Sequence, residues 1–511
     1  MSLLVSSLAV ATGITFAAAP DANADTLPTA PEPATVSNDA LPTVQIDGIV
    51  WSQVVIGNTV YVGGKFSNAR PAGAAAGTNL TPRANILAYD ITTGVLIDSF
   101  APTFNGQIQS LAASPDGTRL YAAGDFTNVN GTNKYRAVAL NPTSGAVIGS
   151  FSPGFNSRTK AVIATNDTVY FGGSFTNVSG VTRTRLAAVS ASNGAVLDWS
   201  PTATGGGNQV TALALTPDNS KLVVGGSFTA LNGEQRFGLG AVDPATGANV
   251  QWDASNLIKN AGTKAGITSL SASNNAIYGT GYVFGGGEAG IPYGNLEGVF
   301  SANPSDGAIN WVNSCHGDTY SAFAMGGVAY SVGHAHDCRT INGFPQTSPW
   351  TWHRAMAFTE NATQLNKTET EGSYYNYAGI PAPSSLNWYP ELAAGNISGA
   401  TQAAWSVSGN NDYLVLGGEF PKVNNTGQQG LVRFARTGLA PNKSGPKVSG
   451  ADFKPTLTSP ANGLVRGTIT ANYDMDNENL TYQVYRQGTA DPVFTTTAKS
   501  NFYTRPTITF K

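Results

Sequence analysis

All four histidines and both cysteines of this 511-residue chain fall between positions 315 and 354. The histidines are His316, His334, His336 and His353. Imidazole is the most common metal ligand and acid–base group near neutral pH, so this concentration indicates a functional site. His334 and His336 are two residues apart, and on a strand they would face the same way. The first hypothesis is therefore a divalent metal held by His334, His336 and His316, with coordination positions left open.

The alternative hypothesis is that these histidines are hydrogen-bonded groups of a rim, which bind a sugar or only support loops. Asp318 or Asp337 could complete a ligand set in the first case. In either case we expect one set of side chains to contact the ligand: His316, Asp318, His334, His336, Trp352, His353 and Arg354. A divalent metal is the only cofactor that the sequence indicates.

The start of the chain indicates export. An apolar run over 3–19 precedes an Ala-Asn-Ala cleavage pattern, which predicts a signal peptide at 1–24. A transmembrane helix is the alternative, but the run is short for crossing a bilayer. Residues 25–41, rich in Pro, Ala and Thr, indicate a flexible linker. We therefore expect a secreted or cell-wall-associated protein with no membrane span after cleavage.

Export favours a disulfide between Cys315 and Cys338, because oxidising compartments keep an even number of cysteines paired. The alternatives are thiolate ligands for a metal, or a nucleophile. Closing this loop would stabilise the fold by about 3 kcal/mol in the chain-entropy model. A disulfide would also hold His316 near His334 and His336.

Composition favours an all-β protein that does not bind nucleic acid. Charged residues make up only 12% of the chain and the net charge is −3, so the basic face that nucleic acids require is missing. The 59 glycines, together with few helix-period apolar stretches, are typical of many strands joined by tight turns.

One phrase recurs seven times: an apolar pair, a glycine pair, a variable residue and usually Phe. The second glycines of these copies are Gly64, Gly124, Gly173, Gly226, Gly281, Gly333 and Gly418. A turn phrase, such as Asp-Pro-Ala-Thr-Gly at 243–247, follows each of the first five copies. Each unit therefore holds four short strands in roughly fifty residues, the pattern of one β-propeller blade. We predict a seven-bladed β-propeller over 42–446, with a β-solenoid or a string of small sandwiches as the alternative.

Blade topology predicts where the special residues lie. In an antiparallel blade, the start of the first strand, the end of the second and the start of the third share one rim. Both cysteines and all four histidines therefore meet on the rim of the sixth blade, which also carries an insertion at 359–387. Aromatic residues crowd this blade, and they either stack on sugars or pack between blade edges. They are Trp350, Trp352, Tyr374, Tyr375, Tyr377, Trp388 and Tyr389.

Two features concern the ends of the propeller. The last blade has little strand-like sequence after its third strand, so we expect 42–46 to supply the fourth and cover the open edge. After residue 446 the pattern changes to the alternating strands of an Ig-like or fibronectin-like β-sandwich at 447–511. Such domains need roughly 100 residues, so we expect this one to be incomplete.

The repeats resemble a family of secreted bacterial propellers, common in actinobacteria, whose units read LYvGGdFtxvnG … LaAldpxTGav. The motif Cys-His-Gly-Asp-Thr-Tyr at 315–320, with His-Ala-His-Asp-Cys at 334–338, is similar to that family's own signature. The resemblance covers about residues 45–445. It implies the propeller fold, export and further domains such as an Ig-like one, but it implies no reaction.

We expect the protein to bind an extracellular glycan or a surface protein through the rim of the sixth blade. The alternative is a metal-dependent enzyme, such as a polysaccharide lyase, that uses the histidine cluster. The sequence assigns no catalytic residue.

Overall fold

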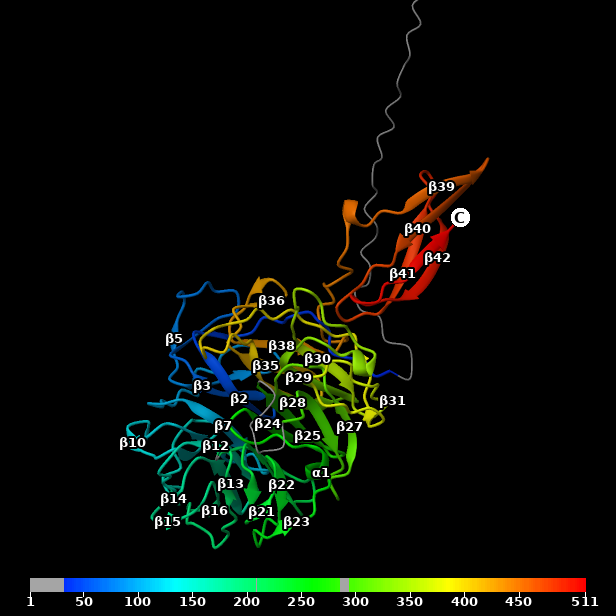
Figure 1. Cartoon of the computed structure of the whole chain (residues 1–511). Coiled ribbons are helices and arrows are strands. Elements are labelled where there is room, and N and C mark those ends of the chain that lie inside the picture. Colours follow the sequence, from blue (N-terminus) through cyan, green and yellow to red (C-terminus); the bar gives the residue numbers. More distant parts are fainter. Residues whose placement is uncertain (1–31, 208, 285–293) are drawn as a thin grey trace, which may run out of the picture.

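The structure, a computed structural model, describes residues 32–207, 209–284 and 294–511. Nearly all regular structure in these residues is β-strand in small antiparallel sheets, which confirms the all-β prediction (Figure 1). The described helical segments are α1 (Ala254–Leu257) and two 3-10 turns, Arg339–Ile341 and Gly450–Asp452. The predicted signal peptide at 1–24 lies outside the described residues. None of the described helices is long and apolar enough to cross a membrane.

Seven of the described sheets share one plan, in which an inner strand pairs with a middle strand and the middle strand with a third. The inner strands are β2 (Ile49–Ile56), β7 (Ile108–Ala113), β12 (Thr159–Ala164), β18 (Val210–Leu215), β24 (Ala265–Ala272), β28 (Thr319–Met325) and β34 (Ala404–Gly409). Each inner strand contacts the next one, and β34 contacts β2, which closes the sheets into a ring. Hydroxyl groups join neighbouring inner strands: Thr268, for example, donates to the carbonyl oxygen of Thr319 at 2.6 Å.

The middle and third strands form the core, because neighbouring sheets cover both of their faces. The middle strands are β3 (Thr59–Lys65), β8 (Leu120–Gly124), β13 (Thr168–Gly173), β19 (Leu222–Gly226), β25 (Ile277–Val283), β29 (Val328–Ala335) and β35 (Tyr413–Gly418). The third strands are β6 (Ile86–Asp90), β11 (Ala137–Leu140), β16 (Leu186–Ser190), β22 (Leu239–Val242), β26 (Gly298–Ala302), β30 (His353–Thr359) and β38 (Leu431–Ala435). Every residue of β8 and β11 is buried, as expected of strands covered on both sides.

Shorter strands complete the sheets and their rims. A fourth strand is assigned in three of the described sheets as β23 (Asn249–Val250), β27 (Ile309–Asn313) and β33 (Ser385–Leu386). The other short strands are β1 (Gln45–Ile46), β4 (Asn68–Arg70), β5 (Thr81–Pro82), β9 (Asn128–Val129), β10 (Thr132–Asn133), β14 (Asn177–Val178), β15 (Val181–Thr182), β17 (Ala203–Thr204), β20 (Ala230–Leu231), β21 (Glu234–Gln235), β31 (Gln364–Leu365), β32 (Pro381–Ala382), β36 (Lys422–Val423) and β37 (Thr426–Gly427).

The last sheet of the ring is completed by residues from the N-terminal side of the chain. This closing segment, 36–41, forms bridges with β38 and the residue after it. The Leu41 N–H donates to the carbonyl oxygen of Arg433 at 2.9 Å. The segment lies earlier than the predicted 42–46 and within the predicted linker. Pro42 has no amide hydrogen and so ends the ladder, while β1 pairs with β4 instead.

Residues 447–511, here called the C-terminal module, form smaller sheets beside the ring (Figure 1). One sheet contains β39 (Thr456–Ala461), β40 (Leu464–Thr470) and β43 (Thr507–Phe510), and a hairpin contains β41 (Asn479–Tyr485) and β42 (Pro492–Lys499). Every second residue of β42 is exposed, as in a strand with one covered face. Phe502 packs against Tyr389 and Phe344 of the ring, with ring centroids 5.0 and 5.9 Å apart.

Candidate functional site

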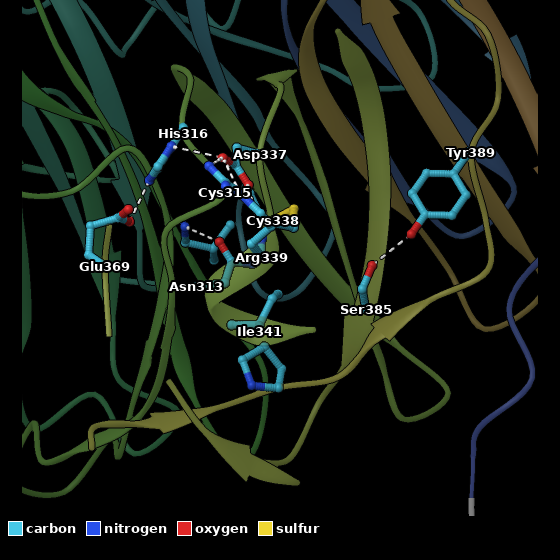
Figure 2. Close-up of a disulfide and its surroundings, with 12 residues drawn as sticks. Asn313, Cys315, His316, Asp337, Cys338, Arg339, Ile341, Glu369, Ser385 and Tyr389 are labelled. Atoms are coloured by element: carbon cyan, nitrogen blue, oxygen red, sulfur yellow. Dashed lines mark hydrogen bonds and ion pairs between the residues drawn. A yellow bond between two sulfur atoms is a disulfide. The ribbon is translucent and has the colours of Figure 1, made fainter. Parts of the chain in front are cut away.

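Cys315 and Cys338 form a disulfide, which confirms the predicted pairing (Figure 2). The bond joins the residues before β28 to those after β29, and both cysteines are buried. Neither cysteine is free, so the alternatives of a thiolate ligand or a nucleophile are excluded. The disulfide fixes the two segments that carry His316 and His336.

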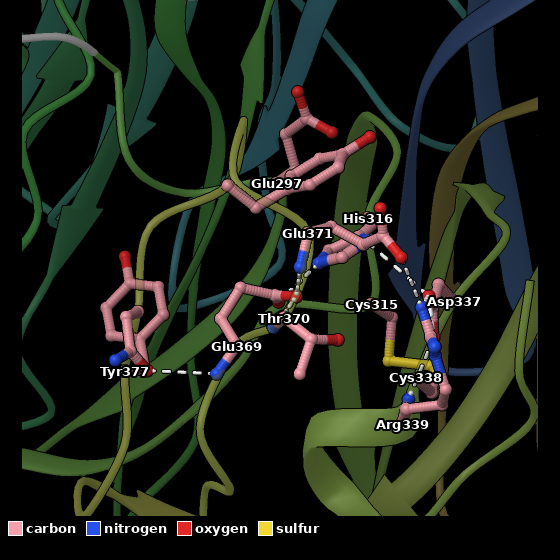
Figure 3. A network of polar contacts seen from close by, with 12 residues as sticks. Glu297, Cys315, His316, Asp337, Cys338, Arg339, Glu369, Thr370, Glu371 and Tyr377 are labelled. Atoms are coloured by element: carbon pink, nitrogen blue, oxygen red, sulfur yellow. Dashed lines mark hydrogen bonds and ion pairs between the residues drawn. A yellow bond between two sulfur atoms is a disulfide. The ribbon is translucent and has the colours of Figure 1, made fainter.

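His316 is buried beneath the insertion that follows β30 (Figure 3). Its Nε2 lies 2.7 Å from Oε2 of Glu369. Its ring stacks on Tyr374, with the two ring centroids 3.5 Å apart. Both partners belong to the predicted insertion at 359–387. The insertion therefore covers His316 and supplies it with an internal partner.

Asp337 is also engaged within the protein. Its Oδ2 lies 2.6 Å from a guanidinium nitrogen of Arg339, which also contacts Glu371 at 2.9 Å (Figure 3). Burial alone would raise the pKa of Asp337, but the hydrogen bonds from Arg339 outweigh burial and lower it. Asp337 is thus a charged anchor for the turn after β29.

His336 supports an exposed tryptophan. Its buried ring stacks on Trp350 with centroids 4.2 Å apart, and 45% of Trp350 is exposed. The hydroxyl oxygen of Tyr374 lies 3.4 Å from Nε2 of His336. Burial, with a contribution from nearby His316, lowers the pKa of His336 to about 4. The imidazole is therefore neutral at neutral pH and acts as a flat backing for Trp350.

His334 lies at the end of β29 and uses both ring nitrogens. Its Nδ1 is 3.1 Å from Oε1 of Gln402, and its Nε2 accepts the Asp318 N–H at 3.3 Å. This pattern places the proton on Nδ1. Burial lowers the pKa of His334, although the Asp318 carboxylate opposes that shift. The ring is a neutral link between two neighbouring sheets.

His353, predicted to contact the ligand, lies instead against the C-terminal module. The C-terminal module covers its ring, which packs between Phe344 and Phe502 at centroid distances of 4.2 and 4.7 Å. Its Nε2 is buried and has no hydrogen-bond partner among the described residues. Burial lowers the pKa of His353 to about 4. His353 is thus a half-buried, neutral residue of the contact between ring and module.

The structure does not gather His316, His334 and His336 as a metal-ligand set. In the described ranges, no group of three or more His, Cys, Asp or Glu side chains is placed to hold a metal ion. The rings of His316 and His336 are 5.8 Å apart and nearly edge to face, while His334 has partners on both nitrogens. Their geometry fits the alternative hypothesis of hydrogen-bonded rim histidines.

Trp352 and Arg354 remain at the surface of the same rim. Trp352 is 45% exposed, and the guanidinium carbon of Arg354 lies 6.0 Å from its ring centroid. Arg354 also donates to the carbonyl oxygen of Leu392 at 3.4 Å. Trp350 and Trp352 thus present two exposed aromatic faces close together in sequence, one backed by imidazole and one by guanidinium.

Asp318 lies in a group of titratable side chains that the sequence indicated only in part. The Tyr320 hydroxyl donates to Oδ2 of Asp318 at 3.3 Å and lies 3.4 Å from Nδ1 of His334. Glu297, which had no motif to identify it, accepts the Gly317 N–H at 2.8 Å. Burial raises the pKa of Glu297 to about 7, and burial also raises the pKa of Asp318.

A β-bulge interrupts every inner strand at the same place, and the repeated glycines accompany it. In β28 the register with β29 shifts between Thr319 and Ser321, so Tyr320 is left unpaired. A Cβ on Gly333 would lie 2.3 Å from the carbonyl oxygen of Asp318, so no other residue fits opposite the bulge. The second glycines of the other copies meet the equivalent carbonyl oxygen in the same way, except Gly281, where an added Cβ would first meet the side chain of Asn260.

Sequence reasoning missed the seven bulged residues, here called the bulge ring. They are Trp51, Gln109, Lys160, Thr211, Thr268, Tyr320 and Trp405. All are half-buried. The ring of Trp405 lies 5.1 Å from that of Trp51 and 4.2 Å from that of Tyr320, so the bulged residues of three sheets meet. A usable signal was present, because each one stands 13 or 15 residues before a second glycine.

Comparison with known proteins gives no family. No family model matches the chain, and no curated protein matches it. The chain is similar to the computationally designed Ika8 protein, with 12% identity, a TM-score of 0.41, and coverage of 78% of this chain and 97% of that one. It is similar at the same identity and TM-score to a chain in the crystal structure of a Mitotic Checkpoint Complex, with coverage of 81% and 98%. Similarity at this level assigns no function.

Proposed function

We propose that the protein is an exported seven-bladed β-propeller with an Ig-like C-terminal module, and that it binds a glycan through the rim around Trp350 and Trp352. The closed ring of similar sheets supports the propeller, and the repeats supply its period. The two small sheets of the C-terminal module support the Ig-like assignment.

The observation that carries the proposal is the Trp350–His336 stack. A sugar ring binds to the flat face of an indole, and the face binds best when it is fixed in advance. Trp350 is half exposed yet held from beneath by a buried neutral imidazole, and the nearby disulfide fixes the strand end that carries His336. Trp352 and Arg354 provide a second face and a hydrogen-bond donor beside it.

A glycan array tests the proposal. We expect Trp350→Ala and Trp352→Ala each to weaken binding about tenfold, the value of one aromatic stack. Tyr135→Ala is the matched control, because Tyr135, in the loop between β10 and β11, is exposed to a similar extent. If both tryptophan variants bind the same glycans as the wild type, the rim of this sheet is not the site.

A second candidate is an enzyme that acts on the bound glycan. The observation that favours it is Glu297, whose pKa of about 7 suits a general acid or base. Tyr320 and Asp318 lie in the same group of side chains. Incubation with acidic polysaccharides, followed by measurement of unsaturated products, distinguishes a lyase from a binding protein. If no unsaturated product forms, or if Glu297→Gln gives the same yield as the wild type, the enzyme hypothesis fails and binding remains the proposed function.

A further inference from the structure

The bulge ring contains a contiguous aromatic arc. Trp51, Trp405 and Tyr320 come from three successive sheets, and each contacts the next. All three keep part of their surface exposed. Trp405 is fixed by a hydrogen bond from its Nε1 to Oε1 of the buried Glu419 at 3.1 Å. Rigid, partly exposed aromatic rings of this kind suit sugar rings.

A chain of polar contacts leads away from this arc. The Trp51 Nε1–H donates to Oε1 of Gln107 at 3.0 Å, and Gln107 donates to Oδ2 of Asp125 at 2.7 Å. The other oxygen of Asp125 accepts from Nε of Arg158 at 2.6 Å. Three contacts in series link Trp51 to Arg158, so the aromatic arc and the basic residues belong to one continuous polar network.

Lys160, the bulged residue of β12, stands next to Arg158. Among the described residues its ammonium group has no hydrogen-bond or ion-pair partner, although the residue is half-buried. Burial lowers the pKa of Lys160, the neighbouring Arg158 adds to that shift, and the Asp125 carboxylate opposes it. The equivalent residues Thr211 and Thr268 instead bond to the next inner strand. A half-buried ammonium group with no hydrogen-bond partner in the protein gains stability when an anion binds beside it.

The charges of the bulge ring and its neighbours are unevenly distributed. Lys160 and Arg158, the latter paired with Asp125, belong to one side of the ring, whereas the sheets that carry Tyr320 and Trp405 also carry the carboxylates Asp318 and Glu419. This order favours one orientation, with the anionic part of a ligand at Lys160 and an uncharged sugar face at Trp51 and Trp405.

We propose that the bulge ring is a second binding site, distinct from the Trp350 rim, for an acidic sugar chain whose carboxylate pairs with Lys160 and Arg158. The inference rests on the proposed function only in taking the ligand to be a glycan. The uronate carboxylate supplies the missing partner of Lys160, and the neighbouring sugar ring stacks on the aromatic arc.

Polygalacturonate and alginate are the probes, and fully methyl-esterified polygalacturonate is the matched ligand without charge. We expect Lys160→Gln to weaken binding of at least one uronate polymer tenfold or more, and to leave binding of the esterified polymer unchanged. Lys160→Arg should retain the affinity. Lys160→Thr introduces the residue that occupies the bulges of β18 and β24, so we expect it to fold and to behave like Lys160→Gln. Lys422→Gln, at an exposed lysine of β36, is the control for loss of any positive charge.

Comparison of Lys160→Gln with Trp350→Ala distinguishes binding at the bulge ring from binding at the Trp350 rim. If Lys160→Gln loses the polymer while Trp350→Ala retains it, the bulge ring binds acidic glycan independently of the rim. If Trp350→Ala loses the polymer while Lys160→Gln binds like the wild type, the proposal for the bulge ring falls and the proposed function stands. Failure of the wild type to bind either uronate polymer, or equal binding of the esterified form, also overturns the proposal.

Discussion

Replacing His353 with phenylalanine isolates the effect of one buried imidazole on pH stability. The imidazole lies between the ring and the C-terminal module, against Phe344 and Phe502, and its Nε2 is buried without a partner in the described structure. A phenylalanine ring fits the same aromatic surroundings and removes an unsatisfied polar atom. We therefore expect the variant to be at least as stable as the wild type at neutral pH.

The magnitude follows from the shift in the pKa of His353, which is 6.5 when unfolded and about 4 in the fold. Because the folded pKa is the lower one, the unfolded chain binds more protons between these values. The stability that the neutral His353 contributes to the fold is therefore fully present above pH 6.5. The free energy of unfolding falls as the pH decreases from 6.5 towards 4. Between about pH 7 and about pH 4.5 the wild type loses about 2 kcal/mol from this group alone. His353→Phe avoids this loss.

Urea unfolding of both proteins at the two pH values measures the effect. The free-energy difference between variant and wild type should grow by about 2 kcal/mol on acidification. Tyr503→Phe is the control, because it alters the same contact without adding a group that titrates in this range. A difference that stays constant with pH would refute the burial of a neutral His353.

Three further predictions concern the scaffold. Thiol labelling of unreduced, denatured protein should find no free cysteine, and the double substitution of Cys315 and Cys338 by serine should cost about 3 kcal/mol in urea unfolding. Gly333→Ala should lower the melting temperature, because the new Cβ would meet a backbone oxygen, whereas Gly149→Ala, with open space around it, should not. Deleting the chain through the closing segment, 36–41, should lower the melting temperature far more than a deletion that stops just before it.

The sequence predicts most of the scaffold, because the repeat consists of turn residues and glycines whose conformational preferences are local. Gly333 and its counterparts mark the strand pairs, and the disulfide was predicted from the two cysteines of a chain expected to be exported. The packing of the His353 ring could not be predicted, because its partner Phe502 lies about 150 positions away in a segment with no repeat. The bulge ring was missed for a different reason: its members share a spacing from the second glycine and not a residue type, and that spacing was not used.

The histidine cluster shows that strand order predicts where the histidines lie but not which way their rings point. The prediction that His316, His334 and His336 lie on one rim rests on strand order, and the structure does bring their segments together through the disulfide and the pairing of β28 with β29. Which way each ring points depends on Glu369, Gln402 and Trp350, which come from an insertion, another sheet and a loop. Spacing within a strand carries no information about these partners.

The closing segment has a consequence for how the chain is made. Leu41 pairs with Arg433, about 390 positions later, so the segment that is synthesised first has no partner until the last sheet is made. A growing chain holds 36–41 as an unpaired strand until β38 has emerged, and contacts this distant in sequence form late in folding. The ring can therefore complete its assembly only when nearly all of its sequence is present, and a chain stopped before β38 leaves both edges open to pairing with other chains.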